Sequence, residues 1–228
     1  MLRFLPILLA VAYGLIAYRF SVWRTKRDLD ARATPLADPT LAPVMARMAK
    51  ALDVPRLKVH IYEIPTINGL AAPDGRVFVT RGLYQLYLAG QITGEELSSV
   101  IAHELGHVAL GHTRRRMIDF SGQNALRMAL SAVLGRILPG LGAMVASGIT
   151  SLLAARLSRD DEFEADAYAT ALLLKAGIGL APQLSLFEKL DAGASARGVP
   201  APAWLSTHPA TPDRIAAIRA NGAKWDRA

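Results

Sequence analysis

The sequence predicts an α+β fold that is mainly helical and contains one small β-sheet. Two observations predict this fold: several segments repeat apolar residues at helical spacing, and two short segments alternate apolar and polar residues as strands do. The chain has 228 residues, of which 52% are hydrophobic and 20% are charged. This length suffices for one well-filled core, or for one core with a small accessory segment.

The composition restricts the possible functional sites. Cysteine is absent, which excludes disulfide scaffolds, thiolate metal sites and cysteine nucleophiles, so that any metal ion must be held by His, Asp or Glu. The formal net charge of +7 would suit either nucleic acid or an anionic membrane surface. The basic residues gather near an N-terminal apolar segment, and no recognised nucleic-acid-binding motif accompanies them. We therefore expect contact with membrane lipid and no nucleic-acid partner.

The N-terminus is predicted to anchor the chain in a membrane. Residues 4–23 provide about 20 mostly apolar positions, roughly the length of a helix that crosses the hydrocarbon core. A cleavable signal peptide is the alternative, but its positive charges should precede the apolar stretch, and here most of them follow it. The predicted organisation is an anchor over residues 1–23, a polar linker over 24–37 and a main domain over 38–222.

The distribution of basic residues predicts the side of the membrane on which this domain lies. Only Arg3 precedes the apolar segment. The basic residues toward its end and beyond it are Arg19, Arg24, Lys26, Arg27 and Arg32. Positive residues near a span stay in the cytoplasm, so we expect a single-pass protein of the bacterial inner membrane with a cytoplasmic domain. A periplasmic domain is the alternative.

Local patterns place the first elements of the domain. They are a helix over residues 39–52, strands over 57–62 and 76–80, and a helix that begins around Leu83. In the first strand, alternation places His60 on the face opposite Val59 and Ile61. We therefore expect His60 to be a solvated strand residue and not a metal ligand.

The segment VIAHELGHVALGH, residues 100–112, places histidines and a glutamate in an otherwise apolar helix. A capping-box pattern of Thr93 and Glu96 predicts that this helix runs from about Gly94 toward His112. Ionisable side chains on an apolar helix are costly to bury unless they are paired or bind a metal ion. The segment is therefore the first candidate for a functional site.

His103 and His107 lie four residues apart, which places them about 40° apart around the helix and roughly 6 Å apart along it. Both imidazoles can therefore reach one ion, and zinc takes imidazole nitrogens readily. Glu104 can take a proton from a water molecule that attacks a polarised carbonyl. His112 lies about 140° around the helix from His107, so we expect it to cap the helix end or contact solvent.

A third ligand is expected from a second helix, predicted over about 160–176. One stripe of this helix carries residues at i, i+3, i+4 and i+7, namely Glu162, Ala165, Asp166 and Ala169. The two alanines would let the stripe approach another helix closely, with Glu162 binding the ion and Asp166 orienting a ligating histidine. The alternative is a surface helix whose acidic residues, Asp160 and Asp161 above all, lie near its positive N-terminus.

Three ordered motifs, HELGH, SRDDEFEAD and THPATPDRI, resemble those of the gluzincin family that includes the CAAX prenyl endopeptidases and the bacterial heat-shock membrane protease HtpX. The resemblance extends over roughly residues 40–220. It implies a zincin-type metalloprotease domain with an HExxH active-site helix and one zinc ion per chain. By this resemblance the metal ligands are His103, His107 and Glu162.

The resemblance also assigns roles to other residues. Glu104 would be the general base, Asp166 would support a histidine ligand, and His208 would stabilise the oxyanion of the tetrahedral intermediate. The segment NGLAAPDGRVFVTRGL resembles the family's edge strand, to which an extended substrate adds as a further strand, and Asn68 is the candidate substrate-binding residue there. Arg159 and Arg214 match family positions without an assigned role.

Proteins related to HtpX usually carry two membrane spans between the zinc motifs, and this chain departs from that pattern. Its apolar stretch is interrupted by Arg136, Pro139 and several glycines, so each half is too short to span a membrane. Residues 125–156 are therefore predicted as an apolar helical hairpin that covers the cleft or lies against the membrane. A true pair of spans is the alternative.

The sequence thus predicts a membrane-anchored zinc metalloendopeptidase. Its polypeptide substrates would be unfolded or membrane-associated proteins, as in protein quality control. A non-catalytic, metal-bearing chaperone or assembly factor of the envelope is the alternative. The presence of Glu104 favours the enzyme, because metal binding alone needs no general base. The sequence indicates neither the physiological substrate nor the oligomeric state.

Overall fold

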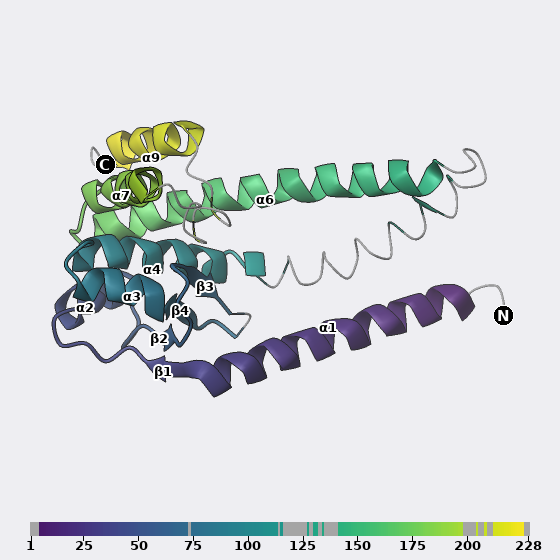
Figure 1. Ribbon diagram of the computed structural model, residues 1–228, viewed down its shortest axis with the longest axis horizontal. Coiled ribbons are helices and arrows are strands. Elements are labelled where there is room, and N and C mark those ends of the chain that lie inside the picture. The colour runs from purple at the N-terminus through teal and green to yellow at the C-terminus, as the bar shows by residue number, and fades with distance from the viewer. Residues whose placement is uncertain are drawn as a thin grey trace. The chain divides into compact units, whose positions relative to one another are not determined.

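The computed structural model describes residues 5–72, 74–113, 115, 127, 130, 131, 134, 141–197, 204, 208 and 212–225. The chain divides into two compact units, Met1–Asp30 with Gly111–Asp161, and Ala31–Leu110 with Glu162–Ala228. The second of these contains the sheet and is called the sheet unit below. Figure 1 shows the elements of both units.

The first unit holds most of helix α1 (Leu5–Arg32). This helix continues beyond the predicted anchor and through most of the predicted linker, because residues 24–32 are rich in Lys, Arg, Leu and Ala, which favour helices. In the part of the chain that the structure describes, no helix is both long and apolar enough to cross a membrane. Residues 1–4 of the predicted anchor and the side chains of residues 5–11 lie outside the described part.

Helix α6 (Gly142–Lys175) begins well before the position predicted for it, because no proline interrupts the chain between these two ends. The second half of the predicted hairpin therefore belongs to this long helix, while most of residues 125–141 lie outside the described residues. Asp160 and Asp161 lie within the helix rather than at its N-terminus, and Asp161 is buried. The alternative of a surface helix with acidic residues at its positive end is therefore wrong.

The sheet unit is built on a four-stranded sheet in the order β1-β2-β4-β3. The strands are β1 (Ala33–Pro35), β2 (Val59–Tyr62), β3 (Gly69–Ala71) and β4 (Val77–Thr80). Strands β2 and β4 run parallel, whereas the β1–β2 and β3–β4 pairs run antiparallel. The predicted strands over 57–62 and 76–80 are confirmed as β2 and β4, each slightly shorter than predicted. Strand β3 forms one edge of this sheet.

The environment of His60 differs from the prediction. Its ring lies 5.3 Å from the ring of Phe78, the residue opposite it on β4, and the side chain is half-buried. Tyr62, on the same face of β2, is buried as well. The expectation of a solvated His60 therefore holds only in part, because β2 is an inner strand and the neighbouring Phe78 covers part of the ring.

Five further helices belong to the sheet unit together with the part of α6 from Glu162 onward, among the described residues. They are α2 (Ala42–Ala51), α3 (Arg81–Leu88), α4 (Gly94–Ala109), α7 (Ala181–Arg197) and α9 (Pro212–Trp225). Helix α2 begins later than predicted, because residues 39–41 form a turn in which the Asp38 carbonyl accepts the Leu41 N–H at 3.2 Å. Helix α3 begins earlier than predicted, because the Thr80 side chain caps it by accepting the Leu83 N–H.

Helix α4 lies at the centre of the sheet unit, where it packs against β3, β4 and α7 (Figure 1). The predicted capping box is confirmed: Thr93 Oγ1 accepts the Glu96 N–H at 3.1 Å, and Glu96 Oε2 accepts the Thr93 N–H at 2.7 Å. The helix ends at Ala109, short of the predicted end at His112, and Gly111 beyond it has φ of +71°. Its buried apolar residues belong to the main core and are Leu97, Val100, Ile101 and Ala102.

Glu96 also fixes α7 against α4. Ser185 Oγ donates to Glu96 Oε1 at 2.6 Å, and Lys189 Nζ donates to Glu96 Oε2 at 2.8 Å. Burial alone would raise the pKa of the Glu96 carboxyl, but the bonds from Lys189, Ser185 and the Thr93 N–H hold this pKa below its ordinary value. Glu96 is therefore ionised in the fold and holds the start of the active-site helix in place.

Candidate active site

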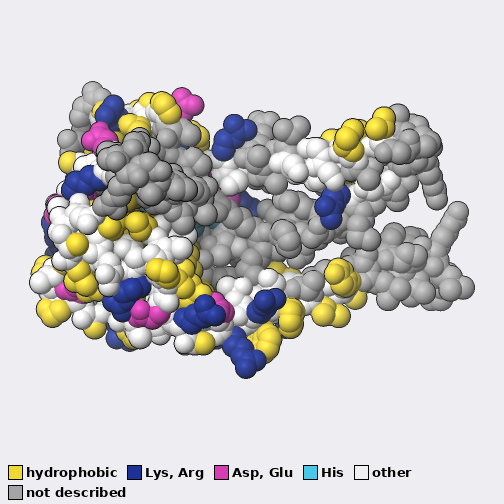
Figure 2. All heavy atoms as spheres, viewed as in Figure 1, with side chains coloured by type: hydrophobic (Ala, Val, Ile, Leu, Met, Phe, Trp, Pro, Cys, Tyr) yellow, Lys and Arg dark blue, Asp and Glu magenta, His cyan; other side chains and the backbone are white. Residues whose placement is uncertain are grey.

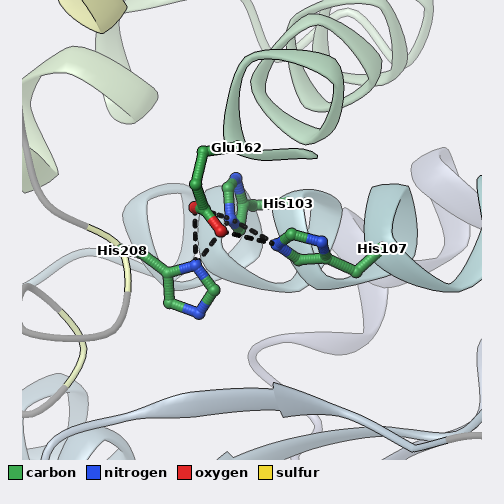
Figure 3. A group of neighbouring side chains, drawn as sticks. All are labelled: His103, His107, Glu162 and His208. Carbon is green, nitrogen blue, oxygen red and sulfur yellow. Dashed lines mark hydrogen bonds and ion pairs between the residues drawn. The ribbon is translucent and has the colours of Figure 1, made fainter. Parts of the chain in front are cut away.

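Helix α4 presents His103 and His107 toward the same point, as Figure 3 shows. Their Nε2 atoms lie 3.1 Å apart, and their rings are nearly perpendicular with centroids 4.7 Å apart. Each residue is 2% exposed. The structure therefore brings together the two imidazoles that the sequence placed one helical turn apart.

Glu162 of α6 joins the two histidines. Its Oε2 lies 3.3 Å from His103 Nε2, and its Oε1 lies 3.5 Å from His107 Nε2. A tetrahedral ion with bonds of about 2.0–2.1 Å keeps its ligand atoms about 3.4 Å from one another. The separations between these ligand atoms are close to that value, so the three side chains fit a small divalent cation.

His208 lies against the same group (Figure 3). Its Nδ1 lies 2.7 Å from Glu162 Oε2 and 3.3 Å from His103 Nε2. Together with His107, these residues offer four possible ligand atoms within 4.8 Å of one another. The other ring nitrogen of His208, Nε2, lies 3.6 Å from Glu104 Oε1. His208 is therefore close to both the metal ligands and the predicted general base.

Glu104 is 2% exposed, and its Oε1 is buried without a hydrogen-bond partner among the described residues. Leaving a buried carboxylate oxygen unpaired is costly. A water molecule held by a metal ion at this group would donate a hydrogen bond to that oxygen and remove the cost. An oxygen without a hydrogen bond at this place would therefore suit a hydrolytic metal site, in which Glu104 would receive a proton from that water.

Asp166 orients the first histidine. Its Oδ1 lies 2.9 Å from His103 Nδ1, which leaves Nε2 of His103 for the ion. Arg214 of α9 binds Asp166 with two hydrogen bonds, from Nε to Oδ2 at 2.6 Å and from Nη2 to Oδ1 at 2.8 Å. Its Nη1 also lies 3.5 Å from Glu162 Oε2. No role for Arg214 could be predicted from the sequence, in which it lies in the THPATPDRI motif.

The carboxylates make this site favourable for a cation. Burial alone would lower the pKa of His103, but Asp166 and Glu162 raise it to about 9. Burial alone would raise the pKa of Glu162, but His103 and His208 lower it. For Asp166, Arg214 and His103 outweigh burial in the same way and lower its pKa. The field that favours a proton on His103 also favours a metal cation at the same place.

A close contact between helices brings Glu162 to α4. A Cβ atom added to Gly106 would lie 3.0 Å from both Cα and the carbonyl oxygen of Ala165. Ala165 and Ala169 are fully buried, and Asp166 is 2% exposed. The predicted stripe is therefore confirmed as the face of α6 that packs on the active-site helix. The glycine inside the HELGH motif permits this close approach. This role of Gly106 is not predicted from the sequence.

Strand β3 lies beside the predicted general base, since a Cβ atom on Gly69 would lie 3.2 Å from Glu104 Oε1. Asn68, the residue before β3, accepts the Gly69 N–H on its own Oδ1 at 3.0 Å, and its carbonyl accepts the Thr80 N–H at 3.0 Å. The Gly69 N–H is thus not used for pairing with β4. Among the described strands, none pairs with the outer edge of β3.

His112 lies outside the group formed by His103, His107, Glu162 and His208. It is fully buried, and its Nε2 lies 3.7 Å from Oδ1 of Asp161, which also binds Arg115. The expectation that His112 contacts solvent or caps the helix end is therefore wrong. The reason is that α4 ends at Ala109 and the chain turns at Gly111, so the helical angle that was used to place His112 does not apply.

Comparisons with known proteins agree with this site. The family described as Peptidase family M48 matches residues 35–221. The metalloprotease LoiP of Escherichia coli K12 is 30% identical over 208 residues, which cover 85% of this chain and 75% of LoiP. The metalloprotease YcaL of the same organism is 29% identical over 231 residues, covering 92% and 86% of the two chains. A protease HtpX homolog of Dictyoglomus thermophilum is 29% identical over 223 residues, covering 82% and 71%.

The matched range contains the complete group of His103, His107, Glu162 and His208. Most of the chain is covered, and the motifs that resembled the gluzincins are the ones that the structure assembles into one buried site. The chain therefore belongs to peptidase family M48 and is a metalloendopeptidase.

Proposed function

We propose that the enzyme holds one zinc ion with His103, His107 and Glu162 and hydrolyses peptide bonds in unfolded or membrane-associated proteins. The buried Oε1 of Glu104 carries this proposal, because it has no hydrogen-bond partner among the described residues and lies 3.6 Å from Nε2 of His208, whose Nδ1 contacts Glu162. A non-catalytic, metal-bearing factor would have no use for such an oxygen.

Each residue of the site has a distinct task. When bound, zinc polarises the scissile carbonyl and lowers the pKa of a bound water toward about 7. Glu104 accepts a proton from the attacking water and delivers it to the leaving amine. His208 donates a hydrogen bond to the carbonyl oxygen as that oxygen becomes negative. Asp166 keeps the ring of His103 turned so that Nε2 faces the ion.

The edge strand supports an extended substrate. A peptide segment that pairs with the outer edge of β3 (Gly69–Ala71) passes directly beside Glu104. A substrate carbonyl can then accept the Gly69 N–H in place of Asn68 Oδ1, which accepts it in the absence of substrate. Only a segment without its own secondary structure can add to an edge in this way, which favours unfolded protein as substrate.

The central experiment replaces Glu104 by Gln in the full chain. The Glu104→Gln variant should retain one zinc per chain and lose cleavage of unfolded casein, because the amide cannot accept the proton. Glu95→Gln is the matched control, since Glu95 lies on the same helix but pairs with Arg47 on the exposed surface. Wild-type activity of Glu104→Gln would refute the mechanism.

The N-terminal helix supports attachment to a membrane. Several large apolar residues of α1 are exposed, and basic side chains lie between and beyond them, as Figure 2 shows along the described part of α1. These apolar residues are Tyr13, Leu15, Ile16, Phe20 and Trp23. Burial of this surface in lipid would remove it from water. After an alkaline carbonate wash of bacterial membranes, the full chain should remain in the pellet, and a Leu15→Arg, Ile16→Arg double variant should be released.

The proposed orientation is a cytoplasmic catalytic domain, supported by the excess of basic residues after the apolar segment. Alkaline phosphatase fused after Ala228 should be inactive, because that enzyme folds only after export, whereas a green fluorescent protein fused there should fluoresce. An active phosphatase with a dark fluorescent fusion would instead place the domain in the periplasm.

A further inference from the structure

Trp204 is a buried residue of the sheet unit that the proposed chemistry does not use. It is 2% exposed and packs against three other rings, with centroid distances of 5.1 Å to Phe187, 5.8 Å to His208 and 6.0 Å to His103. The contact with His103 is edge-to-face, with an interplanar angle of 76°. One indole therefore contacts both a proposed metal ligand and the proposed oxyanion donor.

The backbone of Trp204 connects the same residues to the edge strand. Its N–H donates to the Ile67 carbonyl at 3.0 Å, close to Asn68 and the start of β3. Its carbonyl accepts the His208 N–H at 2.7 Å. Trp204 thus fixes the backbone that carries His208 relative to the strand on which the substrate is proposed to lie.

The indole itself has a rigid support. Phe187 of α7 packs against it, and the guanidinium of Arg214 lies 5.3 Å from the centre of the Phe187 ring. Arg214 is the residue that holds Asp166 with two hydrogen bonds. The aromatic stack that supports Trp204 is therefore joined to the group that orients His103.

We infer that Trp204 is a positioning residue that holds the imidazole of His208 toward the scissile carbonyl. The inference rests on the role proposed above for His208. His208 Nδ1 makes a short contact with Glu162 Oε2. This contact would hold the His208 ring less firmly once the Glu162 oxygens bind a metal ion. The indole packs on the His208 ring, and this ring contact does not depend on the oxygens of Glu162, so it can hold the imidazole in both situations.

The kinetic test combines substitutions at the two positions in the full chain. Trp204→Leu should lower kcat by about 10- to 100-fold with little change in KM, because a displacement of about 1 Å has effects of that size. Trp204→Phe should recover most of the loss, since a ring still packs at the site. In a His208→Phe background, Trp204→Leu should lower kcat no further, because the residue through which it acts is already absent.

A spectroscopic test does not depend on activity. The chain has three tryptophans, and cobalt(II) bound in place of zinc quenches an indole that lies beside its ligands. Cobalt should therefore reduce the fluorescence of the wild-type chain. The Trp204→Phe variant should lose this cobalt-dependent part of the emission. Trp225→Phe, a substitution at the end of α9, should retain it.

The outcomes separate this inference from the proposed function. Suppose that His208→Phe is impaired, but that Trp204→Leu lowers kcat by the same factor in the wild-type chain and in the His208→Phe variant. Trp204 then only fills the core, and the inference is overturned while the proposed mechanism stands. If His208→Phe has the wild-type kcat, both the oxyanion role and the inference are overturned. Cobalt quenching that survives in Trp204→Phe would show that the indole does not lie against the loaded site, and would also overturn it.

Discussion

Replacing Gly106 by Ala should weaken zinc binding, although Gly106 contacts neither the ion nor a ligand atom. The added Cβ would lie 3.0 Å from Cα and the carbonyl oxygen of Ala165 and 3.2 Å from Cβ of Tyr168, all of them tighter than ordinary contacts. Because two of these atoms belong to the backbone of α6, no side-chain rotation relieves the contact. The two helices must give way by a few tenths of an ångström in this close-packed interior.

That separation is large on the scale of a metal site. Glu162 lies one turn before Ala165 on α6, so its carboxylate moves with the helix. Metal–ligand distances tolerate deviations of only about 0.2 Å. We therefore expect zinc affinity to fall by about 10- to 100-fold, as it does when other supports of a ligand are lost. Gly106→Val should lower it further because its side chain is larger. Alanine favours the helix by about 0.5–1 kcal/mol over glycine, so a weakened α4 cannot explain the loss.

The measurement is a competition for zinc between the full chain and a chelator of known affinity. Thermal unfolding of the metal-free variants shows whether each remains folded. Gly148→Ala is the control, because Gly148 lies on α6, the helix that carries Glu162, and a Cβ there meets no atom within 4 Å. Unchanged zinc affinity in Gly106→Ala would refute the argument, and so would an equal loss in Gly148→Ala.

Three further predictions concern the edge strand, the histidine support and the helix start. Gly69→Ala should lower kcat/KM for casein by about 10-fold or more with unchanged zinc content, since its Cβ would lie 2.7 Å from Val100 Cγ1 and 3.2 Å from Glu104 Oε1, and overpacking displaces the strand or the base. Asp166→Asn should lower zinc affinity by about 10- to 100-fold in the same chelator assay, because it weakens the orientation of His103. Glu96 has a lowered pKa in the fold, so its stabilising contribution is present above the unfolded pKa of about 4.3 and is lost as pH falls through the folded pKa. Between about pH 5 and 3, the melting temperature of the wild type should therefore fall more steeply than that of Glu96→Gln.

Each of these predictions has an outcome that contradicts it. Loss of zinc from Gly69→Ala would mean that the strand supports the metal site rather than the substrate. Wild-type zinc affinity in Asp166→Asn would show that packing alone orients His103. Parallel melting curves of the wild type and Glu96→Gln across the acid range would show that the bonds of Glu96 to α7 do not contribute to stability.

The parts of the site that could be predicted from sequence are those set by local geometry. The capping box of Thr93 and Glu96 and the stripe that starts at Glu162 each depend on residues within two helical turns of one another. Spacings of this kind can be recognised directly in the sequence. The pairing of His103 with His107 belongs to the same class, because one helical turn determines it.

The parts that could not be predicted depend on residues far apart in the chain. Arg214 binds Asp166 across 48 positions, and no periodic pattern links the two. The ring contact between Trp204 and His103 likewise joins residues that are far apart in the chain. The predicted lengths of α1 and α6 are too short for another reason. Charged residues are typical of linkers and helix starts, but Lys, Arg and Glu also favour helix interiors, where these helices place them.

The charges of the buried site explain why these distant parts must come together with a divalent cation. Glu104, Glu162 and Asp166 are three nearly inaccessible carboxylates, and Arg214 is the buried guanidinium that faces two of them. With neutral histidines this set carries two uncompensated negative charges, which is costly in a protein interior. Without an ion, protons on histidine reduce the excess, as the raised pKa of His103 indicates. A bound divalent cation balances the set fully and leaves the imidazoles neutral, which is the form that binds metal. The charge balance of the buried site and the chemistry proposed for Glu104 therefore both favour a bound divalent cation.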